Sequence, residues 1–218
     1  MSLFPSKIIG SMKKVGVVAG FSVDDLDHAQ PIAEALLDGG LNVIELTLRT
    51  DAAFDALNII IKKVPEMIAG VGTILTPQQV RRVKEMGGAF GVSPGLNPAV
   101  VQECTRVELP FAPGIATPSE LEVAVSLGCR FVKFFPAEPA GGIAYLRSLA
   151  APYSHLGIQY FALGGINNTN MINYLQEPNV PTVGGSWIVD KDLVANNDWK
   201  AIRARAADVR AAVDSRNE

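Results

Sequence analysis

The sequence predicts an α/β fold, a single-domain (β/α)8 barrel that extends over residues 1–218. Two observations predict it. Short apolar runs recur along the chain with amphipathic segments between them, and neighbouring runs are centred about 21–28 residues apart, enough for one strand, one helix and two short loops. No linker or low-complexity segment divides the 218 residues, a length that fits one large domain better than two small ones.

Strands are expected at the apolar runs. The runs are centred on Val17, Ile44, Ala69, Phe90, Phe111, Val132, Tyr160 and Val183. An open doubly wound sheet is the alternative fold, but it usually has fewer strands and often carries Gly-x-Gly-x-x-Gly after the first one. Here the first strand ends with Val18-Ala19-Gly20-Phe21, and Gly70-Val71-Gly72-Thr73 lacks the third glycine and lies at the third strand. The sequence therefore favours the barrel and indicates no dinucleotide site.

The segments between the strands are predicted to be helices. Residues 24–38 carry apolar side chains at spacings of three and four, and Gly39-Gly40 marks their end. Thr76-Pro77 predicts an N-cap and a first helical residue for a helix that reaches Met86. Thr117 and Glu120 are spaced as a capping box at the start of another helix. A last helix, rich in alanine, arginine and aspartate, is expected at about residues 197–213.

The composition excludes several classes of function. The net charge is −3 with both signs scattered along the chain, so no nucleic acid partner is expected. No apolar run approaches the roughly 18 residues that cross a membrane, and residues 1–14 lack the apolar segment of a signal peptide. Cys104 and Cys129 form no paired motif, and His28 and His155 have no nearby ligand partners. We therefore expect a cytoplasmic protein with reduced cysteines and with no metal or other cofactor.

Lys133 lies in the most informative stretch, Phe131-Val132-Lys133-Phe134-Phe135-Pro136-Ala137-Glu138. Alternation along a strand places Phe131, Lys133 and Phe135 on one face, so the ammonium would share its side of the strand with two phenyl rings. An apolar surrounding disfavours the charged form and would supply the neutral amine that forms Schiff bases with carbonyl compounds. The alternative is a lysine at a strand end that reaches solvent or pairs with a carboxylate.

Glu45 is the second candidate, inside the predicted second strand and on the same face as Val43 and Thr47. A carboxylate in an apolar strand is costly unless it is hydrogen-bonded or functional. We expect a functional carboxylate at this position. The alternative is a structural ion pair with Arg49 or Lys133.

Other unusual residues follow strands, where the chemistry of a barrel collects. Thr73 follows the third strand, Ser93-Pro94-Gly95 the fourth and Pro113-Gly114-Ile115 the fifth, and each of these alone is an ordinary turn. Paired glycines end the last two strands, Gly164-Gly165 and Gly184-Gly185-Ser186. Because paired glycines let backbone N–H groups approach an anion, and barrels often bind phosphate after these two strands, a phosphate site is expected there.

Together these residues resemble the family of 2-keto-3-deoxy-6-phosphogluconate (KDPG) and 4-hydroxy-2-oxoglutarate (KHG) aldolases of class I. The likeness runs from about Val17 to Trp199 with its blocks in family order. The blocks are Val43-Ile44-Glu45-Leu46-Thr47-Leu48-Arg49-Thr50, Gly70-Val71-Gly72-Thr73, Ser93-Pro94-Gly95-Leu96, Pro113-Gly114-Ile115, the stretch around Lys133, and Gly184-Gly185-Ser186-Trp187.

The resemblance implies a metal-free lyase that forms a homotrimer. It further implies a role in carbohydrate metabolism, in the Entner–Doudoroff pathway. Such an enzyme splits a keto acid phosphate into pyruvate and glyceraldehyde 3-phosphate, or KHG into pyruvate and glyoxylate. By this likeness Lys133 forms the Schiff base and Glu45 is the general acid and base. Substrate-binding residues would be Arg49, Thr73, Pro94, Phe135 and Leu163, and phosphate-binding residues would be Gly164, Gly165, Gly184, Gly185 and Ser186.

The chain departs from the family pattern at two places. Where the family has Pro-Thr-Gly-Gly it has Ala162-Leu163-Gly164-Gly165, which resembles the phosphogalactonate aldolases and leaves the preferred C4 epimer open. The first strand also differs, since many relatives have a longer apolar run there. Two other functions remain as alternatives: a phosphosugar isomerase or epimerase with Glu45 as base, and a barrel that binds phosphorylated ligands without turnover.

Overall fold

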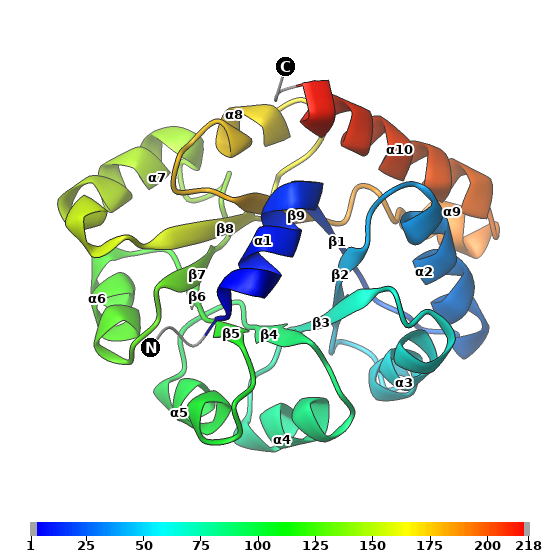
Figure 1. Cartoon of the computed structure of the whole chain (residues 1–218), viewed down its shortest axis with the longest axis horizontal. Coiled ribbons are helices and arrows are strands. Elements are labelled where there is room, and N and C mark those ends of the chain that lie inside the picture. The colour runs from blue at the N-terminus through cyan, green and yellow to red at the C-terminus, as the bar shows by residue number, and fades with distance from the viewer. Residues whose placement is uncertain (1–3, 216–218) are drawn as a thin grey trace.

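The computed structural model describes residues 4–215, in which parallel strands form a barrel surrounded by helices (Figure 1). The strands are β1 (Val17–Phe21), β2 (Val43–Thr47), β3 (Ile68–Gly72), β4 (Phe90–Val92), β5 (Phe111–Ala112), β6 (Gly114–Ile115), β7 (Phe131–Phe134), β8 (Gln159–Leu163) and β9 (Thr182–Gly185). Every predicted strand centre lies in one of them. The predicted (β/α)8 barrel is confirmed.

The fifth strand of the barrel is divided into β5 and β6 by Pro113. Proline has no N–H to donate to a sheet. β5 pairs with β4 and β6 pairs with β7, while the Pro113 carbonyl accepts a hydrogen bond of 2.9 Å from the Lys133 N–H. The two halves therefore join the ends of the order β5-β4-β3-β2-β1-β9-β8-β7-β6 and close the barrel.

Ten α-helices lie in residues 4–215. They are α1 (Ser6–Val15), α2 (Ala29–Asp38), α3 (Ala53–Lys63), α4 (Pro77–Glu85), α5 (Pro98–Arg106), α6 (Pro118–Ser126), α7 (Gly142–Ala150), α8 (Met171–Leu175), α9 (Lys191–Ala195) and α10 (Trp199–Ser215). Two boundaries differ from the prediction. α2 begins after a 3-10 turn at Leu26–His28, because Pro31 is tolerated only in the first turn of a helix. α10 begins after Asn197, whose φ of 54° is not helical.

The helix α1 was not predicted, and it closes the amino end of the barrel. It crosses in front of the strands in Figure 1 and buries Met12 and Val15. Ahead of it, the Phe4 ring packs against Phe131 at 4.6 Å and Phe90 at 5.7 Å between ring centroids. Both partners begin their strands, so this aromatic layer lies at the amino ends, opposite the end where barrels carry their sites.

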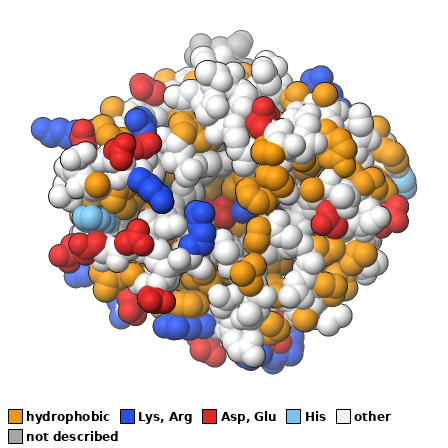
Figure 2. All heavy atoms as spheres, turned by 180° about the vertical axis from the view of Figure 1, so that it is seen from behind, with side chains coloured by type: hydrophobic (Ala, Val, Ile, Leu, Met, Phe, Trp, Pro, Cys, Tyr) orange, Lys and Arg blue, Asp and Glu red, His pale blue; other side chains and the backbone are white. Residues whose placement is uncertain are grey.

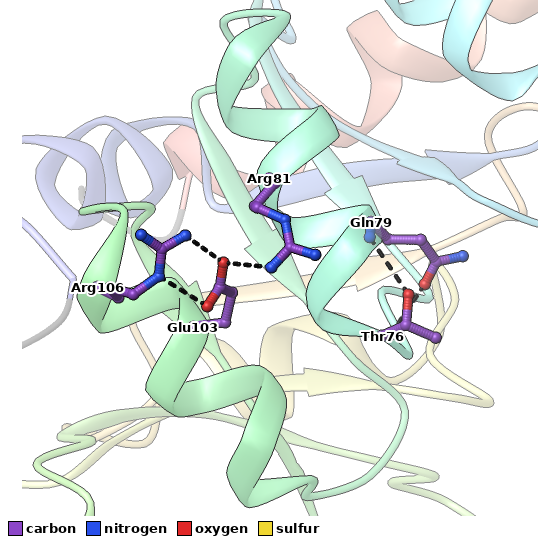
Figure 3. A network of polar contacts seen from close by, with 5 residues as sticks. All are labelled: Thr76, Gln79, Arg81, Glu103 and Arg106. Carbon is purple, nitrogen blue, oxygen red and sulfur yellow. Dashed lines mark hydrogen bonds and ion pairs between the residues drawn. The ribbon is translucent and has the colours of Figure 1, made fainter.

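Polar contacts join α4 to α5 on the outside of the barrel (Figure 3). Thr76 and Gln79 form a capping box at the start of α4, and Thr117 and Glu120 form the predicted one at the start of α6. The Glu103 carboxylate of α5 accepts from Arg81 of α4 at 2.8 Å and from Arg106 at 2.6 Å. These bonds fix two neighbouring helices relative to each other.

Candidate active site

A cavity of about 1100 Å³ opens at the carboxyl ends of the strands. Figure 2 shows this face, which is hollowed near its centre. The predicted site residues that line the cavity are Glu45, Arg49, Thr73, Pro94, Lys133, Phe135, Leu163, Gly164, Gly165, Gly185 and Ser186. Gly184 is not among the lining residues, because it lies buried in β9 beneath the side chains of Phe161 and Leu163.

Lys133 and Glu45 form an ion pair across the barrel. The Lys133 Nζ atom of β7 donates to Glu45 Oε1 of β2 at 2.9 Å, and the two side chains are 6% and 3% exposed. β2 and β7 lie on opposite sides of the closed order of strands, so both side chains reach the axis. Burying a charge pair costs desolvation that the pairing must offset. The ion pair foreseen for Glu45 is therefore formed, and it places an acid beside the candidate amine.

Two phenyl rings were expected beside the ammonium. The first is that of Phe135, whose ring centroid lies 5.1 Å from Lys133 Nζ. This distance allows a cation–π contact. Phe131 also faces the interior but belongs to the layer below, where its ring stacks on Phe161 at 6.2 Å and contacts Phe4. The apolar surrounding of the amine thus comes from one ring above and a layer of rings beneath.

Gly72 makes the position of Glu45 possible. It is paired in register with Thr47, two residues after Glu45 on the same face of β2. A Cβ atom at Gly72 would lie 2.0 Å from Glu45 Oε1, the oxygen that accepts from the lysine. Any larger residue would displace the carboxylate from Lys133.

Arg49 presents an unpaired guanidinium to the cavity. Its Nε donates to Thr47 Oγ1 at 3.1 Å, and that hydroxyl also contacts Ser22 Oγ at 2.7 Å and donates to the Phe21 carbonyl at 3.1 Å. No carboxylate within residues 4–215 forms an ion pair with Arg49, so the alternative pair between Glu45 and Arg49 does not exist there. An arginine fork held by one nitrogen and free at the others is suited to a carboxylate.

Thr73 and Pro94 complete this side of the cavity. Thr73 has φ of 61°, a left-handed conformation that is strained for a β-branched residue. Such strain collects at functional sites. Pro94 is fixed from behind, because a Cβ atom at Gly114 would lie 2.2 Å from its carbonyl oxygen.

The loops after β7 and β8 form the opposite wall and are joined by backbone hydrogen bonds. Ala137 N–H donates to the Leu163 carbonyl at 2.7 Å and Glu138 N–H to the Gly164 carbonyl at 2.9 Å. Gly164 and Gly165 have φ of 95° and 82°, which glycine adopts without strain.

The same wall is anchored to α8. The Tyr174 hydroxyl donates to the Glu138 carboxylate. Burial, together with this bond, raises the pKa of Tyr174. The phenol therefore stays protonated and keeps Glu138, and with it the loop after β7, in place.

Sequence reasoning missed the two loops that form the rim. After β1, Ser22, Asp24, Asp25 and His28 line the cavity, and after β9 so do Asp190, Lys191 and Asp192. His28 is half-buried beside Trp199, with ring centroids 5.5 Å apart. Their position after the first and last strands of a barrel was the available signal.

Residues 4–215 contain neither a membrane-spanning helix nor a cluster of metal-binding side chains. No helix in that range is long and apolar enough to cross a bilayer. The same residues contain no group of three or more histidine, cysteine, aspartate or glutamate side chains arranged to hold a metal ion.

The fold and the site define a barrel enzyme that can bind an anionic carbonyl compound beside an amine and an acid. The family model for KDPG and KHG aldolases matches residues 8–205. The 2-dehydro-3-deoxy-phosphogluconate aldolase of Haemophilus influenzae is 38% identical over 93% of this chain and 94% of its own. The KHG/KDPG aldolase of Escherichia coli is 42% identical over 85% and 86%.

A solved structure agrees with these relatives. The KDPG aldolase of Legionella pneumophila, with pyruvate captured at low pH as a covalent carbinolamine intermediate, superposes with a TM-score of 0.88. It is 36% identical, and the match covers 92% of this chain and 97% of that one. The chain belongs to the KDPG and KHG aldolase family, as its sequence motifs predict. It is a class I aldolase, a carbon–carbon lyase.

Proposed function

We propose that this chain cleaves a 2-keto-3-deoxy sugar acid 6-phosphate into pyruvate and glyceraldehyde 3-phosphate through a Schiff base on Lys133. The observation that carries the proposal is the buried contact of 2.9 Å between Lys133 Nζ and Glu45 Oε1. An amine must lose a proton before it attacks a carbonyl group, and the glutamate is placed to take that proton. The relatives named above act on such substrates by name.

The reaction begins when the neutral Lys133 amine adds to the C2 ketone. Glu45 supplies the proton with which the carbinol oxygen leaves as water, and an iminium remains. Glu45 then takes the proton of the C4 hydroxyl, C4 becomes the aldehyde carbon, and the electron pair of the C3–C4 bond moves into the iminium to form an enamine. Protonation of C3 by Glu45 and hydrolysis release pyruvate and the free lysine.

The carboxylate of the keto acid is assigned to Arg49 and Thr73, with Pro94 and Phe135 as walls of the pocket. Arg49 is supported by its free guanidinium nitrogens and Thr73 by its strained backbone in the cavity. The phosphate is assigned to the loops after β8 and β9, at Gly164, Gly165, Gly185 and Ser186. Gly184 leaves the space into which Leu163 and Phe161 pack.

KHG is a second substrate of the same site, because its distal carboxylate can replace the phosphate as the anion. The charge of the rim disfavours the phosphate dianion relative to the distal carboxylate of KHG. Asp24, Asp25, Asp190 and Asp192 line the cavity beside Lys191. These carboxylates would repel a dianion more than a monoanion, so backbone N–H groups must supply most of the affinity.

The C4 epimer of the phosphorylated substrate, a 2-keto-3-deoxy-6-phosphogalactonate, is a second candidate that one observation favours. Leu163 is 6% exposed and lines the cavity on β8. An apolar wall offers no hydrogen bond to a C4 hydroxyl and so removes a means of rejecting the other epimer. Comparing kcat/KM for both C4 epimers, with and without phosphate, decides between these substrates.

Reduction with borohydride in the presence of pyruvate tests the Schiff base. Intact mass should increase by one reduced pyruvyl group per chain, and Lys133→Ala should show no increase. Lys84, which donates to the Glu108 carbonyl on the exterior, gives the matched control Lys84→Ala, which should be labelled like the wild type. A folded wild-type protein without the adduct would favour an isomerase or a binding barrel and reject the lyase assignment.

The family resemblance further supports a homotrimer in the cytoplasm, with residues 1–218 as one domain. Cys104 and Cys129 are buried free thiols, and burial raises the pKa of Cys129 to about 11, which suits a reducing compartment. Multi-angle light scattering measures the trimer directly. A monomer at micromolar concentration would contradict it.

A further inference from the structure

Glycines facing the barrel interior leave room that neighbouring side chains occupy. A Cβ atom at Gly70 would lie 2.0 Å from the Phe90 ring, and one at Gly184 would lie 2.8 Å from Leu163. At Gly72 the neighbour is Glu45, again at 2.0 Å. Each of these glycines is required because another residue fills the space.

Gly20 is different, because no side chain fills the space beside it. It lines the cavity on β1 and is paired in register with Glu45 of β2. The nearest atoms to a Cβ at this position are the Gly185 carbonyl oxygen at 3.8 Å and Glu45 Oε2 at 3.9 Å. These are ordinary van der Waals distances, so one carbon atom fits there without moving the protein.

This space adjoins the oxygen of Glu45 that does not bind Lys133, since the lysine bonds to Oε1. In the proposed reaction, on which this inference rests, Glu45 returns a proton to C3 of the keto acid. C3 must therefore lie within hydrogen-bonding reach of the Glu45 carboxylate, and a group attached to C3 lies next to Gly20.

We propose that the space at Gly20 accepts a methyl substituent on C3, so that the enzyme uses 2-oxobutanoate as well as pyruvate. The chemical class is a straight-chain 2-oxo acid with a methylene group next to the ketone. The Lys133 amine condenses with its C2 ketone and releases water. Glu45 takes one C3 proton to give the enamine, whose C3 attacks an aldehyde carbon while the aldehyde oxygen takes the proton back. Hydrolysis frees a 3-methyl-4-hydroxy-2-oxo acid.

Exchange of C3 protons in D2O, followed by proton NMR, tests this inference without an aldehyde. The wild type should exchange both pyruvate and 2-oxobutanoate. One methylene group gained or lost in a hydrophobic pocket changes kcat/KM by about 10- to 200-fold, and the two oxygen atoms beside Gly20 place the expected effect at the lower end of that range. Gly20→Ala should therefore lower the ratio of 2-oxobutanoate to pyruvate exchange by about tenfold or more, and Gly20→Val should lower it further.

Gly20 is absent from the glycines with positive φ in residues 4–215, so alanine is compatible with its backbone and thermal melting should confirm a folded variant. Gly10→Ala in α1 is the matched control, since nothing lies within 4 Å of that Cβ position, and its ratio should equal that of the wild type. Exchange of pyruvate but not of 2-oxobutanoate by the wild type would overturn the inference alone. An equal loss of the pyruvate and 2-oxobutanoate exchange rates in Gly20→Ala would also overturn it. That result is expected if the space beside Gly20 holds a water that donates to Gly185 O and Glu45 Oε2. No exchange of either acid would reject the proposed function as well.

Discussion

One proton shared between Lys133 and Glu45 determines what the site can do. In the ion pair the lysine is a cation and cannot attack a carbonyl group. In the proposed reaction, transfer of the proton over 2.9 Å would create both the nucleophile and the acid that removes water. One buried hydrogen bond can therefore supply both the neutral amine and the protonated carboxyl group.

Glu45→Gln keeps the size of this side chain and removes its ability to carry the proton. Turnover should fall by about 10²- to 10⁴-fold, while the borohydride adduct with pyruvate still forms more slowly. Steady-state kinetics and intact mass measure the two effects separately. Turnover equal to the wild type would remove Glu45 from the mechanism.

Thr47 holds the guanidinium of Arg49, to which we assign the substrate carboxylate. Thr47→Val keeps the shape but removes the oxygen that accepts from Arg49 Nε at 3.1 Å. Because the bond involves a charged donor, KM should rise about tenfold with a smaller change in kcat. Thr47→Ser restores the oxygen and should restore KM. A change confined to kcat in Thr47→Val would show that the threonine acts on the chemistry and not on binding.

At the scale of secondary structure, neighbouring helices are fastened by a small number of polar contacts. Glu103 connects α5 to α4 through Arg81, and its side chain is 12% exposed. The guanidinium of Arg106, followed by that of Arg81, lowers the pKa of the Glu103 carboxyl from 4.5 to about 2. The stability of the fold should therefore depend on pH through this carboxyl group.

Because the pKa of Glu103 is lower in the folded chain, its ionised form stabilises the fold above about pH 4.5, the unfolded value, and this stabilisation is lost as the pH falls towards about 2. Glu103→Gln should therefore melt at a lower temperature than the wild type at pH 7, and the two melting temperatures should converge as the pH falls to about 2. Differential scanning calorimetry across this range measures the difference. A gap that stays constant with pH would mean that packing, not charge, carries the effect.

For the whole molecule, the order of strands and the positions of the reactive residues follow from local signals. The spacing of apolar runs locates the strands, and the barrel topology then places Glu45 and Lys133, which are 88 residues apart, at one end of the barrel. The contact distance itself depends on Gly72, whose role is visible only once β2 and β3 are paired.

The helix α1 was not predicted because its sequence carries weak signals. It contains Gly10, begins after Pro5 without a side-chain cap, and buries only Met12 and Val15 of its ten residues. Its helical state depends on packing against the barrel, which no local pattern records. The rim loops were missed for a related reason, since loops are placed by the scaffold they connect.

Phe4→Ala tests how much the amino-terminal closure stabilises the barrel. Phe4 is 2% exposed and contacts two interior rings, so the cavity left by its removal should lower the free energy of unfolding by about 3–5 kcal/mol. Urea denaturation measures the change. Leu75→Ala, a substitution at a side chain that is 50% exposed, is the control with little expected effect. An unchanged denaturation midpoint in Phe4→Ala would show that the packing of Phe4 at the amino end of the barrel does not stabilise the fold.

The ring of Phe4 also limits the route by which molecules enter and leave the site. Since it blocks the end of the barrel beneath Lys133, molecules must come and go through the mouth on the other side. In the proposed reaction the fragment bound to Lys133 would lie deepest, with the aldehyde between it and the exit. The aldehyde must therefore leave first, and in the synthetic direction it must arrive second, onto an enzyme already carrying the keto acid.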